Sequence, residues 1–432
     1  MHIKSLRLTN IRCFEKLTWE LKGLANLAGW HVVLGDNGTG KSTFLKAASL
    51  ATMGEIVTGL IDYKQFVRSQ AQSAEIDVDV TRDLISDTVF AGIVDQSFIS
   101  YSSTVQIGIG PTHPTLGISP AAGQNFENWR SALLDRDTGW FTAAYGPFRR
   151  FSGGDVDLTK RFSSFRHPSR HLTLFFEGVA LSDSIEWLQR LQFEKLEGTR
   201  SDIEVDTVVR FLNQPGFLPN NVKLDKITSA AVEFVDARGT RVAIEDLSDG
   251  YRSILSMTID LLRQLASAYS GIEVFEAGLG SLYAVMPGIV LIDEVDAHLH
   301  PTWQRQIGPW FRKHFPNIQF IVTTHSPLVC QAAADGGSVF KLPTPGTDEV
   351  GRFLEGTELD RLLYGDILDA YSTEVFGSGI TRSDKARGMQ DRLAELNVKS
   401  LSSKLSIREI EERGRLQGIF GSSSSVLPSN GT

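Results

Sequence analysis

The sequence predicts an α/β protein with a largely parallel central sheet. The apolar run Trp30–Leu34 is followed by the glycine-rich segment Gly35–Thr43 and then by a helix start, which is the order of strand, turn and helix found in a P-loop. Two further apolar runs, Gly288–Ile292 and Ile318–Val322, each end in polar residues. Continuous apolar runs of this length are typical of central parallel strands that are covered on both faces.

The glycine-rich segment has the residues that a nucleotide phosphate site needs. Glycines let the backbone wrap a phosphate with its N–H groups, and the following helix N-terminus adds partial positive charge. Lys41 would reach the β- and γ-phosphates, and the Ser42 hydroxyl would ligate Mg²⁺. The residues of this segment predicted to contact nucleotide are Asn37, Gly38, Thr39, Gly40, Lys41, Ser42 and Thr43.

The composition is that of an ordinary globular protein. The 432 residues include 41% hydrophobic and 22% charged residues, enough to bury a large core in two lobes or domains. The net charge of −8 means that any DNA contact must use a local basic stretch, such as residues 149–150 or 160–170. No apolar run reaches membrane-spanning length, the N-terminus lacks the apolar core of a signal peptide, and only Cys13 and Cys330 carry thiols. We therefore expect a cytoplasmic protein without a membrane partner or a disulfide framework.

The N-terminal half of the chain combines expected strands with expected helices. We expect strands over 3–9 and 17–22, a P-loop helix to about Met53, and a mixed section from 56 to 240. Within that section the expected strands are 74–80, 105–109, 139–145 and 230–235, and the expected helices are 128–134, 182–195 and 202–212. Glycine and proline between Gly108 and Gly123 predict a surface loop, and the absence of a heptad array argues against a coiled-coil arm.

The C-terminal half returns to a motif-rich core. Leu247–Ser253 opens a helix with one apolar face, for which Ser248 is a candidate N-cap. The expected organisation is an N-terminal core part with the P-loop (1–55), an inserted lobe (56–240), a C-terminal core part (241–345), a helical extension (346–420) and a disordered tail (421–432).

Three residues at predicted strand ends carry the candidate chemistry. Asp293 is placed to hold Mg²⁺ opposite the P-loop, and Glu294 to polarise a water for attack on a γ-phosphate. His325 follows the next strand, where it could hydrogen-bond the γ-phosphate. The alternatives are that the paired acids only mark a surface turn and that the lone histidine is structural.

These motifs resemble, in kind and order, those of ATP-binding-cassette (ABC) ATPases. Within that class they are similar to the SMC and RecF branch and its OLD-like relatives, as are the opening segment Leu6–Phe14 and the segment Glu294–Pro301. The resemblance covers residues 1–55 and 241–335. It implies a P-loop NTPase fold of ABC type with a mixed central sheet, an N-terminal antiparallel β-subdomain and a helical or mixed inserted lobe.

The resemblance also implies roles for Leu247–Ser253, which matches the signature segment of the family. There the serine, matched by Ser248, reaches the γ-phosphate of ATP held by a partner subunit, and Gly250 also matches. Asp249 and Tyr251 depart from the common Leu-Ser-Gly-Gly-Gln form, in the manner of the OLD-like branch.

Further roles follow from the same resemblance. Asp296 matches the D-loop position at the dimer interface, and Arg12 matches a residue near the nucleotide base. The segment Ala144–Phe151 resembles the stretch that occupies the Q-loop position in OLD-like ATPases. There Arg149 or Arg150 would contact phosphate or DNA, or else lie in solvent.

The chain is similar to a compact OLD-like ATPase without its own nuclease. The sequence shows neither a Toprim-type acidic cluster nor a Cys/His zinc pattern, although the pair His298 and His300 could ligate a metal. It resembles the ATPase subunits of bacterial anti-phage defence systems, such as PtuA of Septu and the ATPases of PARIS or retron systems. This implies an Mg²⁺-dependent ATPase that forms a head-to-tail homodimer or higher homo-oligomer on ATP and controls a separate effector, such as a nuclease or toxin.

Two other functions remain open from the sequence. A DNA-repair or DNA-clamping ATPase of the RecF or SMC type would bind DNA in an ATP-dependent manner. A slow-turnover scaffold would use ATP as a structural switch for a partner protein. A transporter subunit fits less well, because the N-terminal turn and the inserted lobe resemble the SMC and RecF side of the class.

Overall fold

The computed structural model describes most of the chain. It describes residues 1–23, 27–53, 61–81, 100–110, 114–120, 141–151, 153–155, 166–199, 203–270, 273–365, 370, 384–402 and 404–420. The helix expected near 128–134 and the tail 421–432 lie outside these residues. The chain divides into two compact units, Met1–Ile367 and Leu368–Thr432.

A mixed sheet lies at the centre of the first unit. Its strands are β3 (Gly29–Leu34), β7 (Thr142–Tyr145), β13 (Gly288–Ile292), β14 (Ile318–Thr323), β15 (Ser338–Lys341) and β16 (Arg352–Phe353). The six strands have the order β16-β15-β3-β14-β13-β7. All neighbours from β15 to β7 run parallel, and β16 is antiparallel to β15. Every residue of β3, β7, β13 and β14 is buried, as expected for strands covered on both faces.

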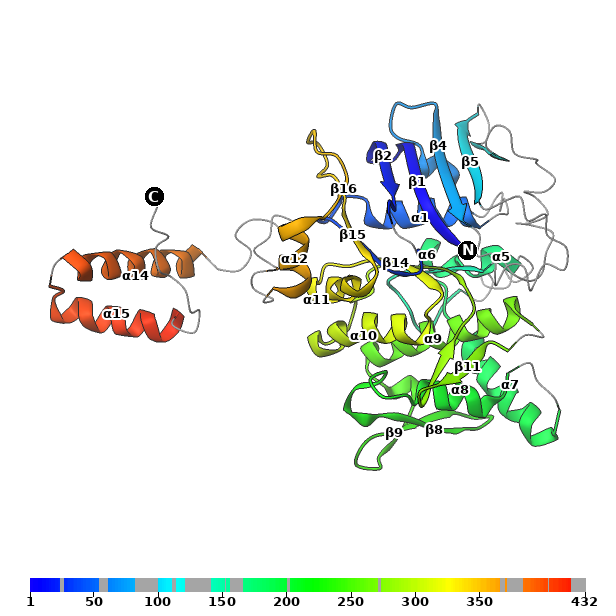
Figure 1. Cartoon of the computed structure of the whole chain (residues 1–432). Helices are drawn as coiled ribbons and strands as arrows, with labels where there is room; N and C mark the ends of the chain where they lie inside the picture. Colours follow the sequence, from blue (N-terminus) through cyan, green and yellow to red (C-terminus); the bar gives the residue numbers. More distant parts are fainter. Residues whose placement is uncertain are drawn as a thin grey trace. The chain divides into compact units, whose positions relative to one another are not determined.

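A second sheet is antiparallel and begins at the N-terminus (Figure 1). It contains β1 (His2–Ile11), β2 (Phe14–Glu20), β4 (Ser73–Thr81), β5 (Ser100–Ile109) and β6 (Pro114–Pro120). Its order is β2-β1-β4-β5-β6, so strands from both sides of residue 55 form one sheet. The expected N-terminal antiparallel β-subdomain is confirmed.

The surface loop predicted between Gly108 and Gly123 is wrong for most of its length. Residues 114–120 form β6, which pairs in register with β5. β6 is the edge strand of its sheet, and an edge strand tolerates glycine and terminal prolines because only one side needs ladder hydrogen bonds. The turn-forming residues therefore concealed a strand.

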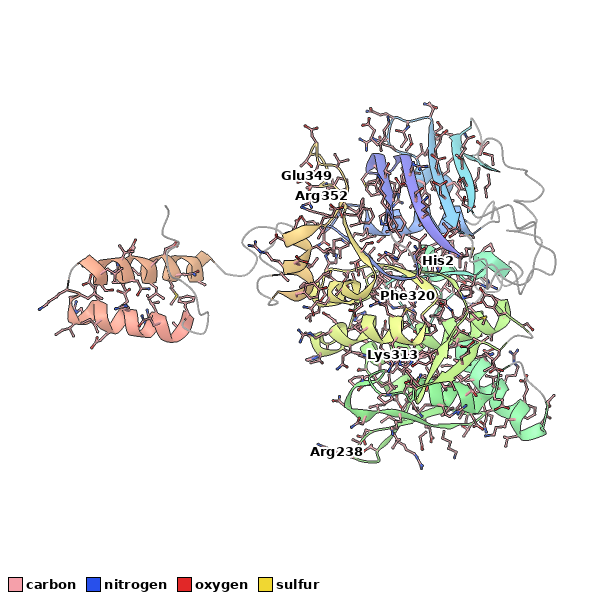
Figure 2. The ribbon with its side chains drawn as sticks, viewed as in Figure 1. His2, Arg238, Lys313, Phe320, Glu349 and Arg352 are labelled. Carbon is pink, nitrogen blue, oxygen red and sulfur yellow. The ribbon has the colours of Figure 1, made fainter. Side chains whose placement is uncertain are left out.

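The P-loop helix α1 (Lys41–Thr52) joins the two sheets in one apolar core. Its buried side chains pack with residues of β1, β4 and β5 and with β13 and β14. Gln319 on β14 adds a polar link, since its side chain accepts from Ile3 N at 2.7 Å and donates to Ile3 O at 2.8 Å. The neighbouring His2, labelled in Figure 2, has its Nε2 2.9 Å from Asn317 O.

Two long helices lie near the other face of the central sheet (Figure 1). They are α9 (Asp249–Ala268) and α10 (Pro301–His314). Phe311 of α10 packs on Trp30 of β3 and on Phe320 of β14, with ring centroids 6.4 and 5.4 Å apart. Figure 2 labels Phe320 within the sheet and Lys313 on α10. Helices therefore pack on both faces of the central sheet, and ligands of such α/β proteins bind beyond the carboxyl ends of the strands.

A lobe of mixed structure packs against α10. Its elements are α7 (Asp183–Glu197), α8 (Val205–Leu212), β8 (Lys223–Ile227), β9 (Val232–Val235), β10 (Arg241–Ala243), β11 (Phe275–Gly278) and β12 (Ser281–Ala284). Phe211 and Phe217 hold the lobe to Trp310 of α10, with ring centroids 5.5 and 4.4 Å apart. Shorter elements of the first unit are η1 (Tyr63–Phe66), α5 (Arg166–Ser169), α6 (Leu172–Phe175), η2 (Pro219–Asn221), η3 (Ile244–Asp246), α11 (Pro327–Cys330), η4 (Gln331–Asp335) and α12 (Gly356–Tyr364).

The second unit contains a pair of antiparallel helices, α14 (Asp384–Ser402) and α15 (Ile407–Phe420). Arg392 pairs with Glu412 at 3.3 Å, and Lys399 pairs with Glu409 at 2.6 Å. The helical character expected for this region is confirmed for these residues. Across the described part of the chain, no helix combines the length and the apolar character that a membrane span requires.

Candidate functional site

The P-loop has a backbone that requires glycine at two positions. Gly38 and Gly40 have φ angles of 82° and 97°, which other residues rarely adopt. A Cβ on residue 40 would also lie 2.5 Å from Cys13 Sγ and 2.6 Å from Phe14 Cζ. The turn between β1 and β2 therefore packs directly on the phosphate-binding segment.

Lys41 is the first residue of α1 and is nearly buried. Its Nζ donates to Gly35 O at 2.7 Å and to Asp36 O at 2.9 Å. Burial lowers the pKa of Lys41, and the charges of Glu294 and Asp293 oppose that drop. The ammonium is thus bound to the loop and within electrostatic reach of the strand-end carboxylates, as expected for a lysine that contacts a terminal phosphate.

The other predicted nucleotide contacts of the P-loop differ in exposure. Asn37 and Gly38 are exposed, Ser42 is half-buried and Thr43 is buried. The Thr39 hydroxyl donates to Asp36 O at 2.9 Å, which tightens the loop. Backbone N–H groups at the tip and the Ser42 hydroxyl thus remain the groups of this segment best placed for a ligand.

The parallel sheet gathers the candidate residues at one edge. Because β3, β14, β13 and β7 run parallel, the segments that follow them all leave from their carboxyl ends. These segments are the P-loop, Thr324–Ser326, Asp293–Glu294 and Gly146–Arg149. The structure therefore places Lys41, Ser42, Asp293, Glu294 and His325 along the same edge of the sheet.

Thr323, which the sequence did not single out, holds the carboxylate of Asp293 and the backbone of Glu294. Its hydroxyl donates to Asp293 Oδ1 at 2.6 Å and accepts from Glu294 N at 2.8 Å. Asp293 is 3% exposed, whereas Glu294 is half-exposed with a φ of 46°. A positive φ at a residue other than glycine is strained and is frequent at functional sites.

Arg149 is buried rather than solvated, and its direct contacts are to protein. It is 4% exposed and follows β7. Its guanidinium donates to Gly146 O, Asp293 O and Glu294 O at 3.1, 2.9 and 3.0 Å, and to Ser253 Oγ at 2.9 Å. Arg150 is exposed and donates to Glu177 O at 3.2 Å. The solvated state expected for these arginines is therefore wrong for Arg149 and right for Arg150.

The segment after β14 holds His325 in an exposed position between two anchored residues. The Thr324 hydroxyl donates to Asp296 Oδ1 at 2.6 Å, and the Ser326 hydroxyl donates to Gln304 Oε1 at 2.7 Å. The carboxylate of Asp296, the expected D-loop residue, is thus tied to the same turn. The two threonines at the end of an apolar run were the sequence signal for this network.

Ser248 stands at the N-terminus of α9 with its side chain exposed. It occupies the N-cap position in an extended conformation, but its side chain makes no capping hydrogen bond, so the predicted capping role of the hydroxyl is wrong. Gly250 packs on the chain after the D-loop, since a Cβ there would lie 2.6 Å from His298 O. The signature segment therefore presents a free-standing serine from a firmly packed helix start.

Arg12 lies on the β1–β2 turn that packs on the P-loop. It is exposed, has a φ of 46°, and donates from Nε to Gln65 O at 2.7 Å. Its guanidinium lies 5.6 Å from the centroid of the Phe66 ring. A flat cation held beside the P-loop suits contact with a nucleotide base.

The oxygen groups at the sheet edge fit Mg²⁺. A buried carboxylate oriented by a hydroxyl (Asp293) and a helix-start hydroxyl (Ser42) are hard oxygen donors, and Mg²⁺ in proteins is commonly held by one or two such groups together with substrate phosphates. The histidine pair is different. His300 is the N-cap of α10, with Thr302 Oγ1 2.8 Å from its Nδ1. Across the described residues, no group of three or more His, Cys, Asp or Glu side chains forms a metal site.

The parallel sheet order, the P-loop and the strand-end carboxylates define a P-loop ATPase. The family model described as "AAA domain, putative AbiEii toxin, Type IV TA system" matches residues 113–331, just over half of the chain. The chain belongs to this AAA-domain family.

Two relatives support the resemblance that the motifs indicated. The retron Vc95 probable ATPase of Vibrio cholerae is 42% identical over 384 residues, covering 75% of this chain and 71% of that protein. The Septu protein PtuA of Bacillus mycoides is 25% identical over 399 residues, covering 91% of this chain and 46% of that protein. The chain thus spans just under half the length of this PtuA. The similarity to Septu and retron ATPases is confirmed.

Among solved structures, the SMC head domain from Thermotoga maritima aligns with 82% of this chain and 99% of its own length. The TM-score is 0.42 and the sequence identity is 14%.

Proposed function

We propose that this chain binds and hydrolyses ATP with Mg²⁺ and that two copies close head-to-tail around the nucleotide. The observation that carries the catalytic part is the setting of Glu294. Its carboxylate follows the buried Asp293 at the end of β13, its N–H is held by Thr323, and its carbonyl is held by Arg149. The charges of Glu294 and Asp293 both oppose the drop in the pKa of Lys41, so the proposed base, metal ligand and phosphate ligand lie close enough to interact electrostatically.

Each residue at this edge has a distinct role in the proposal. Lys41 and the P-loop N–H groups would neutralise the β- and γ-phosphates. Mg²⁺, held by Ser42 and Asp293, would supply charge stabilisation at the phosphates. Glu294 would accept a proton from the attacking water. His325, exposed at the end of β14, would hydrogen-bond the γ-phosphate.

Dimer formation is supported by the state of the signature segment. Ser248 is exposed and its hydroxyl is not used to cap its own helix. The N-terminus of a twenty-residue helix favours an anionic ligand. A γ-phosphate bound on the P-loop of a second copy would meet both features, with Asp296 at the interface between the copies.

The biological role that we propose is that of a regulator in an anti-phage defence system. Its support is the similarity to PtuA of Septu and to the retron Vc95 ATPase. ATP would shift the population from separate to closed subunits, and the closed assembly would hold or release a separate effector, such as a nuclease or toxin.

The test is the Glu294→Gln variant of the full chain. Loss of the base should lower ATP turnover by about 100-fold or more while ATP binding is retained, so the closed dimer should accumulate. Turnover can be followed by phosphate release and assembly by sedimentation with ATP and Mg²⁺. Glu276→Gln, on the exposed part of β11, is the matched control and should behave as wild type.

Three results would count against the proposal. Wild-type turnover by Glu294→Gln would exclude this residue as the base. An ATP-bound variant that stays monomeric would exclude the dimer. Binding to DNA that depends on ATP and weakens steeply with salt would instead support the DNA-clamping function.

A further inference from the structure

Arg149 contacts two parts of the protein that serve different nucleotides in the proposed dimer. Two of its hydrogen bonds reach the backbone of the strand-end residues Asp293 and Glu294, at 2.9 and 3.0 Å. A third reaches Ser253 Oγ in the second turn of α9, at 2.9 Å. Asp293 and Glu294 belong to the nucleotide site of the same subunit, whereas α9 presents Ser248 to the partner subunit.

The bonding of Arg149 is unusual for a buried cation. Its four contacts are all neutral oxygens, although buried charges are normally balanced by an opposite charge. Burial lowers the pKa of Arg149 to about 10, and the charges of Asp293, Asp296 and Glu294 oppose the drop. The guanidinium therefore remains charged at neutral pH. A hydrocarbon side chain could fill this space at lower desolvation cost. The hydrogen bonds of Arg149 therefore point to a positioning role.

The contact with Glu294 falls on a strained residue. Glu294 has a φ of 46°, and both of its backbone groups are held, the N–H by Thr323 and the C=O by Arg149. Rotation of the backbone at Glu294 would redirect its carboxylate and would pull on Arg149. The arginine would transmit such a movement to Ser253 and the start of α9.

A second link to α9 starts from the neighbouring strand β7. The Tyr145 hydroxyl, at the end of β7, donates to Asp260 Oδ2 at 3.0 Å. Asp260 lies two turns beyond Ser253 on α9 and also accepts from Arg263 Nη2 at 2.7 Å. This link joins α9 to the sheet through the Tyr145 side chain alone, whereas the Tyr145 carbonyl accepts from Asp293 N at 2.8 Å. Removing only the hydroxyl therefore provides a control that leaves the backbone bond to Asp293 in place.

We propose that Arg149 couples the two nucleotide sites of the dimer, by joining the strand-end peptide of its own site to the helix that completes the partner's site. The inference rests on the proposed head-to-tail dimer. Arg149 is a positioning residue, because it acts on nucleotide through Glu294 and through α9. Arg149 lies in the segment Ala144–Phe151, which resembles the stretch at the Q-loop position of OLD-like ATPases.

The coupling can be tested with Ser253→Ala, which removes only the helix end of the link. We expect the ATP dependence of turnover to be sigmoidal in wild type, with a Hill coefficient between 1 and about 2, the number of sites. Ser253→Ala should reduce the coefficient to about 1. Its ATP affinity, measured at protein concentrations too low for assembly, should stay within about twofold of wild type. Ser253→Thr keeps a hydroxyl acceptor and should restore the cooperativity.

Two comparisons make the result decisive. Tyr145→Phe removes one buried hydrogen bond to α9 and keeps the backbone bond from Asp293 N to Tyr145 O, so it should lower stability but keep the wild-type Hill coefficient. Arg149→Lys cannot bridge three segments and should resemble Ser253→Ala. If Ser253→Ala and Arg149→Lys keep the wild-type coefficient, or if Tyr145→Phe loses it equally, the coupling role is wrong. A wild type that neither assembles with ATP nor shows cooperativity would instead overturn the proposed dimer, and the coupling with it.

Discussion

The hydroxyl of Thr323 donates to Asp293 Oδ1 at 2.6 Å. Thr323 ends β14 and Asp293 follows β13, two neighbouring parallel strands. The same hydroxyl accepts from Glu294 N at 2.8 Å. One side chain from an adjacent strand therefore sets the orientation of the candidate metal ligand and the backbone of the candidate base.

Replacing Thr323 should impair the use of Mg²⁺ more than the fold. In Thr323→Val the side chain keeps its shape but loses both bonds, so Asp293 is no longer oriented. We expect turnover to fall by about 10- to 100-fold, with a higher Mg²⁺ concentration needed for half-maximal rate. Thr323→Ser retains the hydroxyl and should stay close to wild type. An unchanged Mg²⁺ titration in Thr323→Val would contradict this role.

Gly40 offers a test of the P-loop geometry. Gly40→Ala combines a strained φ of 97° with a Cβ 2.5 Å from Cys13 Sγ, so the loop or the β1–β2 turn must move. We expect ATP affinity to fall by at least about tenfold, measured by titration calorimetry. Gly239→Ala has a similar φ of 83° but open space around the new Cβ, so it should cost only about 1 to 2 kcal/mol of stability. Equal effects of both substitutions on ATP affinity would contradict the steric argument.

His31 should make stability depend on pH. Its ring lies in β3 with Nδ1 2.9 Å from Ser338 Oγ and Nε2 3.0 Å from Leu27 O. Burial lowers its pKa from 6.5 to about 4, although the Leu27 carbonyl opposes the shift. The fold thus favours the neutral ring, and the unfolded chain binds the proton first as the pH falls.

We expect the contribution of His31 to the free energy of unfolding to be fully present above pH 6.5. It should decline by about 3 kcal/mol as the pH falls from 6.5 to 4. Denaturant unfolding at several pH values should show this decline in wild type. In His31→Asn the part of the decline due to this ring should vanish, although stability is lower at every pH. The same pH slope in both proteins would show that His31 does not titrate as described.

The central strands and the P-loop were predictable because each depends on a local pattern. Continuous apolar runs identified β13 and β14, and the glycine spacing identified the turn before α1. The edge strand β6 was missed because its prolines and glycine are also turn residues. Local sequence could not distinguish the two, since the pairing partner β5 decides the outcome.

The supporting residues of the site were harder to predict than the residues that face a ligand. Thr323 and Arg149 act through residues far away in the sequence. An arginine after a short strand is usually solvated, and only the fold shows that Arg149 is enclosed by α9 and the end of β13. Their roles depend on three-dimensional contacts for which the sequence has no fixed spacing.

In the proposed dimer, each nucleotide site combines the P-loop of one subunit with the signature segment of the other. Lys41→Ala disables the P-loop and Ser248→Arg disables the signature segment, so each variant alone should be inactive. In a mixed dimer one site combines both defects and the other is intact. Mixing equal amounts should therefore restore about a quarter of wild-type turnover, because half of randomly formed dimers are mixed. No gain over the separate variants, or full activity of Ser248→Arg alone, would contradict the shared site.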